Sequence, residues 1–176
     1  MRRVLAAAWL TVAVLAGWGR PADDYLLPKE DTLLRDAEGF ELRSYYRLRV
    51  VSRRIDALEC RHRPDKAFDC GKRRDRDPLM GALDERSDER LLRDYREALR
   101  VMLLNVEDVF ASHRGRVVEK VLLDLKKQAD HDVEVLDAIE GGLKEPAELR
   151  TAWEQARSLA LKAASGARKG LERISR

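Results

Sequence analysis

The segment Cys60-Arg-His-Arg-Pro-Asp-Lys-Ala-Phe-Asp-Cys70 contains both cysteines of the chain and separates two long amphipathic stretches. Two cysteines with nine residues between them form a disulfide in an oxidising compartment, whereas a zinc site needs two further ligands and a redox motif has a two-residue spacing. We therefore predict a structural disulfide between Cys60 and Cys70. Closing this loop contributes about 3 kcal/mol in the chain-entropy model.

The N-terminus indicates the compartment. Residues 1–3 are Met-Arg-Arg, residues 4–16 are apolar apart from Thr11, and residues 17–19 are Gly-Trp-Gly. This pattern is typical of a secretory signal peptide, and we predict residues 1–19 as one, cleaved after Gly19. The apolar run is shorter than the roughly 20 residues that span a bilayer, so a retained anchor is the less favoured alternative. The predicted location is the periplasm, or outside the cell.

The charge balance excludes one class of partner. Removing residues 1–19 takes away Arg2 and Arg3 and no acid, which changes 35 Lys and Arg against 32 Asp and Glu to 33 against 32. A net charge of +1 gives no support to nucleic-acid binding, which needs a clustered basic excess. The remaining length suits one domain: residues 20–30 are predicted as a flexible arm and residues 31–176 as a single helical domain.

Hydrophobic periodicity predicts helices throughout. Apolar residues recur at alternating spacings of three and four in four segments, which are residues 32–60, 87–110, 117–139 and 149–174. Residues 61–77, with Pro64, Gly71 and alternating charges, are predicted as a loop. Residues 112–116 are predicted as a turn, because one helix over 87–140 would be about 80 Å long and would outrun its neighbours.

These segments predict an all-α protein, an antiparallel up-down four-helix bundle with one disulfide-closed loop. The alternative is an elongated three-helix arrangement with one long central helix. Gly166 and Gly170 suggest that the last turns fray. Phe68 is expected to pack beside the disulfide, and Tyr95 is expected at the edge of the core with a solvated hydroxyl.

The acidic end of the third helical segment opposes its own helix dipole and needs compensation. We expect this from surface pairs with Arg49, Arg53 and Arg54 of the first segment, and the alternative is a cationic partner. The acidic residues concerned are Asp130, Asp132, Glu134, Asp137 and Glu140.

No catalytic motif is present in the sequence. The histidines are His62, His113 and His131, and no spacing gathers them. The pair His131 and Glu134 has the i, i+3 spacing of di-iron bundles, but the further inward glutamates of those sites are missing. The prediction is a non-enzymatic protein with no cofactor and no metal. The alternative is a helical bundle that binds a small molecule or a metal ion through His131 and the acidic end of its helix. This alternative includes a catalytic protein.

Because the sequence contains no catalytic motif, the function that we expect is the binding of a partner through the protein surface. We expect the basic, disulfide-closed segment to bind a protein partner, as an inhibitor, immunity factor, chaperone or envelope assembly accessory would. The residues predicted to contact this partner are Arg61, His62, Arg63, Lys72, Arg73, Arg74 and Arg76. Contact with a membrane surface and formation of a homodimer stay open.

Overall fold

The computed structural model describes residues 25–112, 115–143 and 146–175, and every regular element in these ranges is helical. The helices are α1 (Pro28–Asp36), α2 (Gly39–His62), α3 (Ala67–Arg76), α4 (Asp88–Ser112), α5 (Arg116–Ile139) and α6 (Ala147–Ile174), with the 3-10 segments η1 (Pro64–Lys66), η2 (Pro78–Leu83) and η3 (Glu140–Gly142). The predicted all-α class is confirmed. The predicted signal peptide, residues 1–19, lies outside the described residues.

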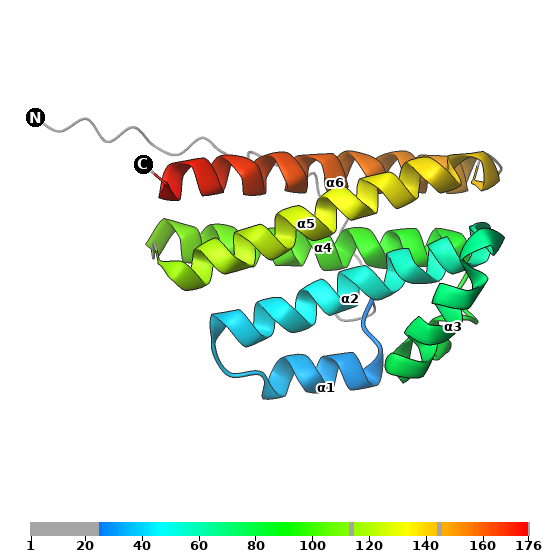
Figure 1. The fold of residues 1–176 in the computed structure, drawn as a ribbon, viewed down its shortest axis with the longest axis horizontal. Coiled ribbons are helices and arrows are strands. Elements are labelled where there is room, and N and C mark those ends of the chain that lie inside the picture. The colour runs from blue at the N-terminus through cyan, green and yellow to red at the C-terminus, as the bar shows by residue number, and fades with distance from the viewer. Residues whose placement is uncertain (1–24, 113–114, 144–145, 176) are drawn as a thin grey trace, which may run out of the picture.

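Four long helices enclose the hydrophobic core (Figure 1). Helix α2 packs along α4 and α5, and α6 packs along the same two helices from the other side. Helices α4 and α5 follow each other in sequence, yet each contacts α6 more than it contacts the other. Helices α2, α4 and α5 supply large, fully buried side chains to this core. Among them are Leu58, Tyr95, Met102, Leu125 and Leu136.

Helix α6 approaches its neighbours closely because its buried face is built of small residues. Ala156, Ala160 and Ala163 are buried against the core. A Cβ atom at Gly170 would lie 3.0 Å from Leu122 Cδ1, so this glycine marks a close contact between α6 and α5. Helix α6 continues past both Gly166 and Gly170 to Ile174.

The first predicted helix, residues 32–60, is two helices. Helix α1 ends at Asp36 and α2 begins at Gly39, whose φ of 77° lies in the left-handed region that glycine adopts without strain. The chain reverses between them, and Figure 1 shows α1 lying beside α2. The break thus follows from one backbone conformation and not from a change in the hydrophobic pattern.

The described part of the predicted arm is packed. Residues 20–24 lie outside the described residues, but Tyr25, Leu27 and Glu30 are all buried. The Glu30 carboxylate accepts a hydrogen bond from the Leu27 backbone N–H at 2.9 Å, which caps the start of α1. From Tyr25 onward the chain therefore belongs to the helical domain.

Of the predicted turn over residues 112–116, residues 113 and 114 lie outside the described residues, but the helices on either side are separate. Helix α4 ends at Ser112, α5 begins at Arg116, and the two run in opposite directions in Figure 1. The alternative with one long central helix is wrong. None of the helices in the described ranges is long and apolar enough to span a bilayer.

The disulfide-closed segment is helical, which corrects the prediction of a loop over residues 61–77. Pro64 opens η1, α3 follows directly, and Pro78 opens η2. Within α3 itself Cys70 is the buried residue, so hydrophobic periodicity could not reveal this helix. A covalent bond and ion pairs hold it to the rest of the molecule.

Candidate functional site

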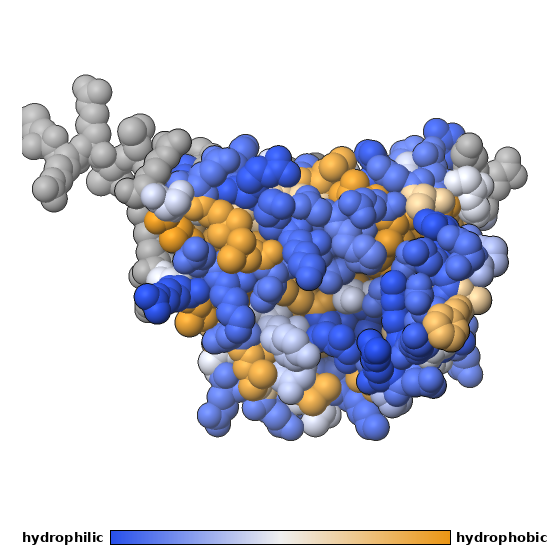
Figure 2. All heavy atoms as spheres, in the orientation of Figure 1, coloured by the Kyte–Doolittle hydropathy of each residue, from blue (hydrophilic) through white to orange (hydrophobic). Residues whose placement is uncertain are grey.

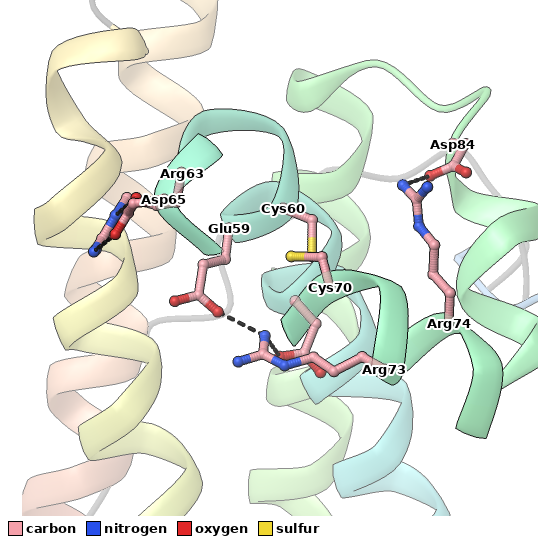
Figure 3. Close-up of a disulfide and its surroundings, with 9 residues drawn as sticks. Glu59, Cys60, Arg63, Asp65, Cys70, Arg73, Arg74 and Asp84 are labelled. Carbon is pink, nitrogen blue, oxygen red and sulfur yellow. Dashed lines mark hydrogen bonds and ion pairs between the residues drawn. A yellow bond between two sulfur atoms is a disulfide. The ribbon is translucent and has the colours of Figure 1, made fainter. Parts of the chain in front are cut away.

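The disulfide between Cys60 and Cys70 fixes α3 to the C-terminal end of α2 (Figure 3). Their Cα atoms lie 5.7 Å apart, within the usual range for a disulfide. The predicted pairing is confirmed. Helix α3 lies outside the group of long helices, at the end where α2 finishes and α4 begins (Figure 1).

Two of the predicted partner-binding residues make internal contacts at this end. Arg61 donates to the Asp88 carboxylate at 2.8 Å and to the backbone carbonyls of Leu83 and Asp84. His62 Nε2 lies 2.8 Å from the second oxygen of Asp88. Both side chains therefore join the end of α2 to the start of α4.

Arg73 connects α3 to α2. Its Nη1 donates to Glu59 Oε2 at 2.6 Å (Figure 3) and to Asp56 Oδ1 at 2.8 Å. The Arg73 side chain is 31% exposed, and the two carboxylates are 17% and 6% exposed. The partial burial makes this a stronger link than a pair on the open surface.

The other predicted cations lie at the surface. Arg63 pairs with Asp65 at 2.8 Å and Arg74 pairs with Asp84 at 2.8 Å, both near the disulfide (Figure 3). Exposed pairs of this kind contribute little to stability and exchange readily with other charges.

The outward side of α3 carries Phe68, Lys72 and Arg76, which we call the α3 outer surface. The spacing i, i+4, i+8 puts them on one helix face. Phe68 is 74% exposed, so the expectation that it packs beside the disulfide is wrong. Lys72 Nζ lies 4.1 Å from the Phe68 ring centroid, whereas Arg76 is exposed and has no ion pair with the described residues. Figure 2 shows apolar surface over this region surrounded by hydrophilic residues.

A second polar group lies between α2 and α5. Asp56, Glu59 and His131 each offer one ligand atom, and these atoms lie within 4.8 Å of one another. We call these three residues the carboxylate–histidine cluster. Burial raises the pKa of Asp56, and Arg73 opposes this shift. Glu134, which has the i, i+3 spacing to His131 noted in the sequence, is exposed and does not belong to the group.

Asp132, beside His131, is fully buried and corrects two expectations. It accepts hydrogen bonds from the Tyr95 hydroxyl at 3.0 Å and from Gln128 Nε2 at 2.7 Å. Asp132 is therefore not, as we expected, one of the acids that form surface pairs with arginines, and the Tyr95 hydroxyl is not solvated. Burial raises the pKa of Asp132 to about 7, although both hydrogen bonds lower it.

A third polar group is structural and ties α1, α2 and η2 together. Arg54, which is fully buried, donates to both Glu30 oxygens at 2.5 Å, and Arg53 donates to Glu30 at 3.0 Å and to Asp77 at 2.7 Å. Arg49 donates to the same Asp77 carboxylate. Burial would raise the pKa of Glu30, but the hydrogen bonds and charge of Arg54 outweigh it and keep that pKa low.

These arginines do not compensate the acidic end of α5, as the sequence led us to expect. Asp137 instead pairs with Arg157 of α6, and Asp130 pairs with Lys126 one turn earlier in α5. Arg53 and Arg54 are instead paired with Glu30 and Asp77. These partners are more than 20 residues away in the sequence, so the sequence pattern did not indicate them.

A small pocket lies at the start of α6. It has a volume of about 200 Å³ and is lined by Glu140, Leu143, Arg150 and Trp153. The Trp153 indole N–H donates to the Leu136 carbonyl at 2.9 Å and is thus already satisfied. Sites for small molecules are usually about 300–1,000 Å³, so this pocket suits at most a small fragment.

Comparison of the chain with protein-family models, with curated proteins and with solved structures returned no match.

Proposed function

We propose that this chain is a non-enzymatic, periplasmic or secreted binding protein that recognises one acidic protein partner through the α3 outer surface. Such a protein acts as an inhibitor, immunity factor, chaperone or envelope assembly accessory. In this proposal α2, α4, α5 and α6 form an antiparallel up-down four-helix bundle, which serves as the rigid base for α3. No catalytic step is part of it.

The observation that carries the proposal is the exposure of Phe68 on a helix that is covalently held. Phe68 is 74% exposed, and Lys72 and Arg76 follow it on the same helix face. Aromatic and cationic side chains supply much of the binding energy in protein interfaces. A partner with an apolar pocket rimmed by carboxylates complements this surface.

The anchoring of α3 supports the same interpretation. The disulfide and the contacts of Arg73 with Asp56 and Glu59 already order the helix. A surface that is ordered before binding loses less conformational entropy when the complex forms. Arg61, His62 and Arg73, predicted as contacts, have in this proposal the role of holding α3 and its surroundings in place.

The proposed compartment rests on the leader-like residues 1–19 and on the disulfide. A disulfide persists in secreted and periplasmic proteins and is rare in the reducing cytosol.

The test is capture of the partner from a native periplasmic extract with the oxidised, tagged protein, followed by mass spectrometry. The variant Phe68→Ala, Lys72→Ala, Arg76→Ala removes the α3 outer surface, including the contact of Lys72 with the Phe68 ring, and leaves the ion pairs that hold α3 in place. The double variant Leu123→Ala, Lys127→Ala is the matched control, because these exposed α5 residues have the same i, i+4 apolar and cationic spacing.

We expect one stoichiometric partner that binds the unchanged protein and the control and is lost from the α3 variant. Circular dichroism and the melting temperature should be alike for all three proteins. Equal capture by the α3 variant would refute the proposed surface.

The small-molecule form of the predicted alternative draws less support, because the pocket beside Trp153 is small. None of the residues of the carboxylate–histidine cluster lines this pocket.

A further inference from the structure

We propose that Asp56, Glu59 and His131 bind one divalent transition-metal ion of the zinc class, in exchange for the guanidinium group of Arg73. This site is separate from the α3 outer surface and does not depend on the proposed partner. It joins α2 to α5 and uses a ligand set that hydrophobic periodicity did not indicate.

The ligand chemistry fits such an ion. One imidazole nitrogen and two carboxylate oxygens are ligands of Zn²⁺, and three protein ligands leave a fourth position for water. Ca²⁺ and Mg²⁺ prefer oxygen ligands throughout, so His131 selects against them. Asp56 and Glu59 have the i, i+3 spacing that puts both on one side of α2.

The geometry is close to what the ion needs. The three ligand atoms lie within 4.8 Å of one another, so some point between them lies within about 2.8 Å (4.8/√3) of all three. Zinc bonds to nitrogen and oxygen are about 2.0–2.2 Å long. Each ligand therefore has to move inward by at most roughly 0.7 Å, which side chains at the edge of a helix interface achieve by small rotations.

The ligands are oriented and available. The Ser52 hydroxyl donates to Asp56 Oδ2 at 2.9 Å, the kind of supporting hydrogen bond that fixes a metal-binding carboxylate. His131 is half-buried and makes no hydrogen bond or ion pair with the described residues, which leaves its ring nitrogens free for a metal.

Arg73 already shows that a cation is stable at this position. Its Nη1 bridges Asp56 and Glu59 at 2.8 and 2.6 Å, with the remaining Glu59 oxygen outside that contact. A dication attracts the same two carboxylates more strongly than the single charge of a guanidinium. Since Arg73 comes from α3 and is 31% exposed, it can move aside while the disulfide keeps α3 attached.

The first test is calorimetric titration of the oxidised, metal-free protein with ZnCl2 at neutral pH. We expect one ion per chain, and we expect His131→Ala and Asp56→Asn each to weaken binding about tenfold or more. His62→Gln is the matched histidine control, and Glu134→Gln is the carboxylate control on α5. Both should bind Zn²⁺ as the unchanged protein does.

Two further results decide the exchange with Arg73. The variant Arg73→Gln should bind Zn²⁺ more tightly, because the competing charge is removed, and MgCl2 should give no binding to any of the proteins. Unchanged Zn²⁺ affinity in both His131→Ala and Asp56→Asn would overturn the site. Weaker or equal binding by Arg73→Gln would overturn the exchange. Partner capture does not enter this test, so the two proposals fail independently.

Discussion

Replacing Glu30 with alanine should destabilise the protein more than any single change at its surface. The Glu30 carboxylate is buried and receives hydrogen bonds from the Leu27 backbone N–H, from Arg53 and, on both oxygens, from Arg54. The Glu30→Ala variant leaves the fully buried guanidinium of Arg54 without its counter-charge. Arg53 keeps its second partner, Asp77, so Arg54 bears most of the loss.

The expected cost is about 3–5 kcal/mol, the range found when one member of a buried ion pair is removed. The lost cap at the start of α1 adds about 1 kcal/mol. For a domain of this size about 1 kcal/mol lowers the melting temperature by roughly 2–4 °C, so the melting temperature should fall by about 10 °C or more. Helix α1 should be released first, because Glu30 is the point at which it is tied to α2.

The assay is urea unfolding followed by far-ultraviolet circular dichroism, with the free energy of unfolding taken by linear extrapolation. The double variant Glu30→Leu, Arg54→Met is the control, since removing both charges together should cost less than removing Glu30 alone. The i, i+4 ion pair between Asp31 and Arg35 lies at the surface and gives a second control. The variant Asp31→Ala should change the free energy of unfolding by less than about 1 kcal/mol. A loss below about 1 kcal/mol for Glu30→Ala would show that water or other groups already compensate Arg54 and would refute the reasoning.

The same carboxylate predicts acid sensitivity: its folded pKa lies below the ordinary value of 4.5, so its contribution is complete above about that pH and is lost as pH falls through the folded pKa. The variant Glu30→Gln should make stability depend less on pH in this acidic range. An unchanged loss of stability with falling pH in the variant would show that Glu30 is not the group responsible. Replacing Cys60 and Cys70 with serine should cost about 3 kcal/mol in urea unfolding, and proteolysis should then cut first within α3; equal protease resistance with and without the disulfide would count against this role. Gly170→Leu should cost about 1–3 kcal/mol because the new side chain meets Leu122, whereas Gly166, with open space around it, should accept the same change at little cost.

The fold class could be predicted because its causes are local. The alternating spacing of apolar residues predicted the regions of the four long helices, and the disulfide followed from two cysteines ten positions apart. Gly39 could have predicted the break between α1 and α2, but a glycine within an otherwise helical pattern is also tolerated, and its φ of 77° is a property of the folded chain.

The polar sites could not be predicted because their causes are distant in sequence. Arg54 looks like a surface residue until Glu30, 24 positions earlier, is placed beside it. Tyr95 and Asp132 are 37 positions apart, and neither shows from sequence alone that it has a buried partner. For Phe68, the spacing to Lys72 and Arg76 was a usable signal, but it became meaningful once residues 67–76 were known to be a helix.

The alanine face of α6 has a consequence for how sequences of this fold can vary. At Ala152, Ala156, Ala160, Ala163 and Ala167 almost every substitution adds volume, so α6 is sensitive to enlargement. The faces of α2 and α4 carry larger apolar side chains and are sensitive to the opposite change, since truncation there leaves cavities. Sequences that keep this fold should therefore carry only small side chains along the buried face of α6. Along the buried faces of α2 and α4 they should keep side chains above a minimum size.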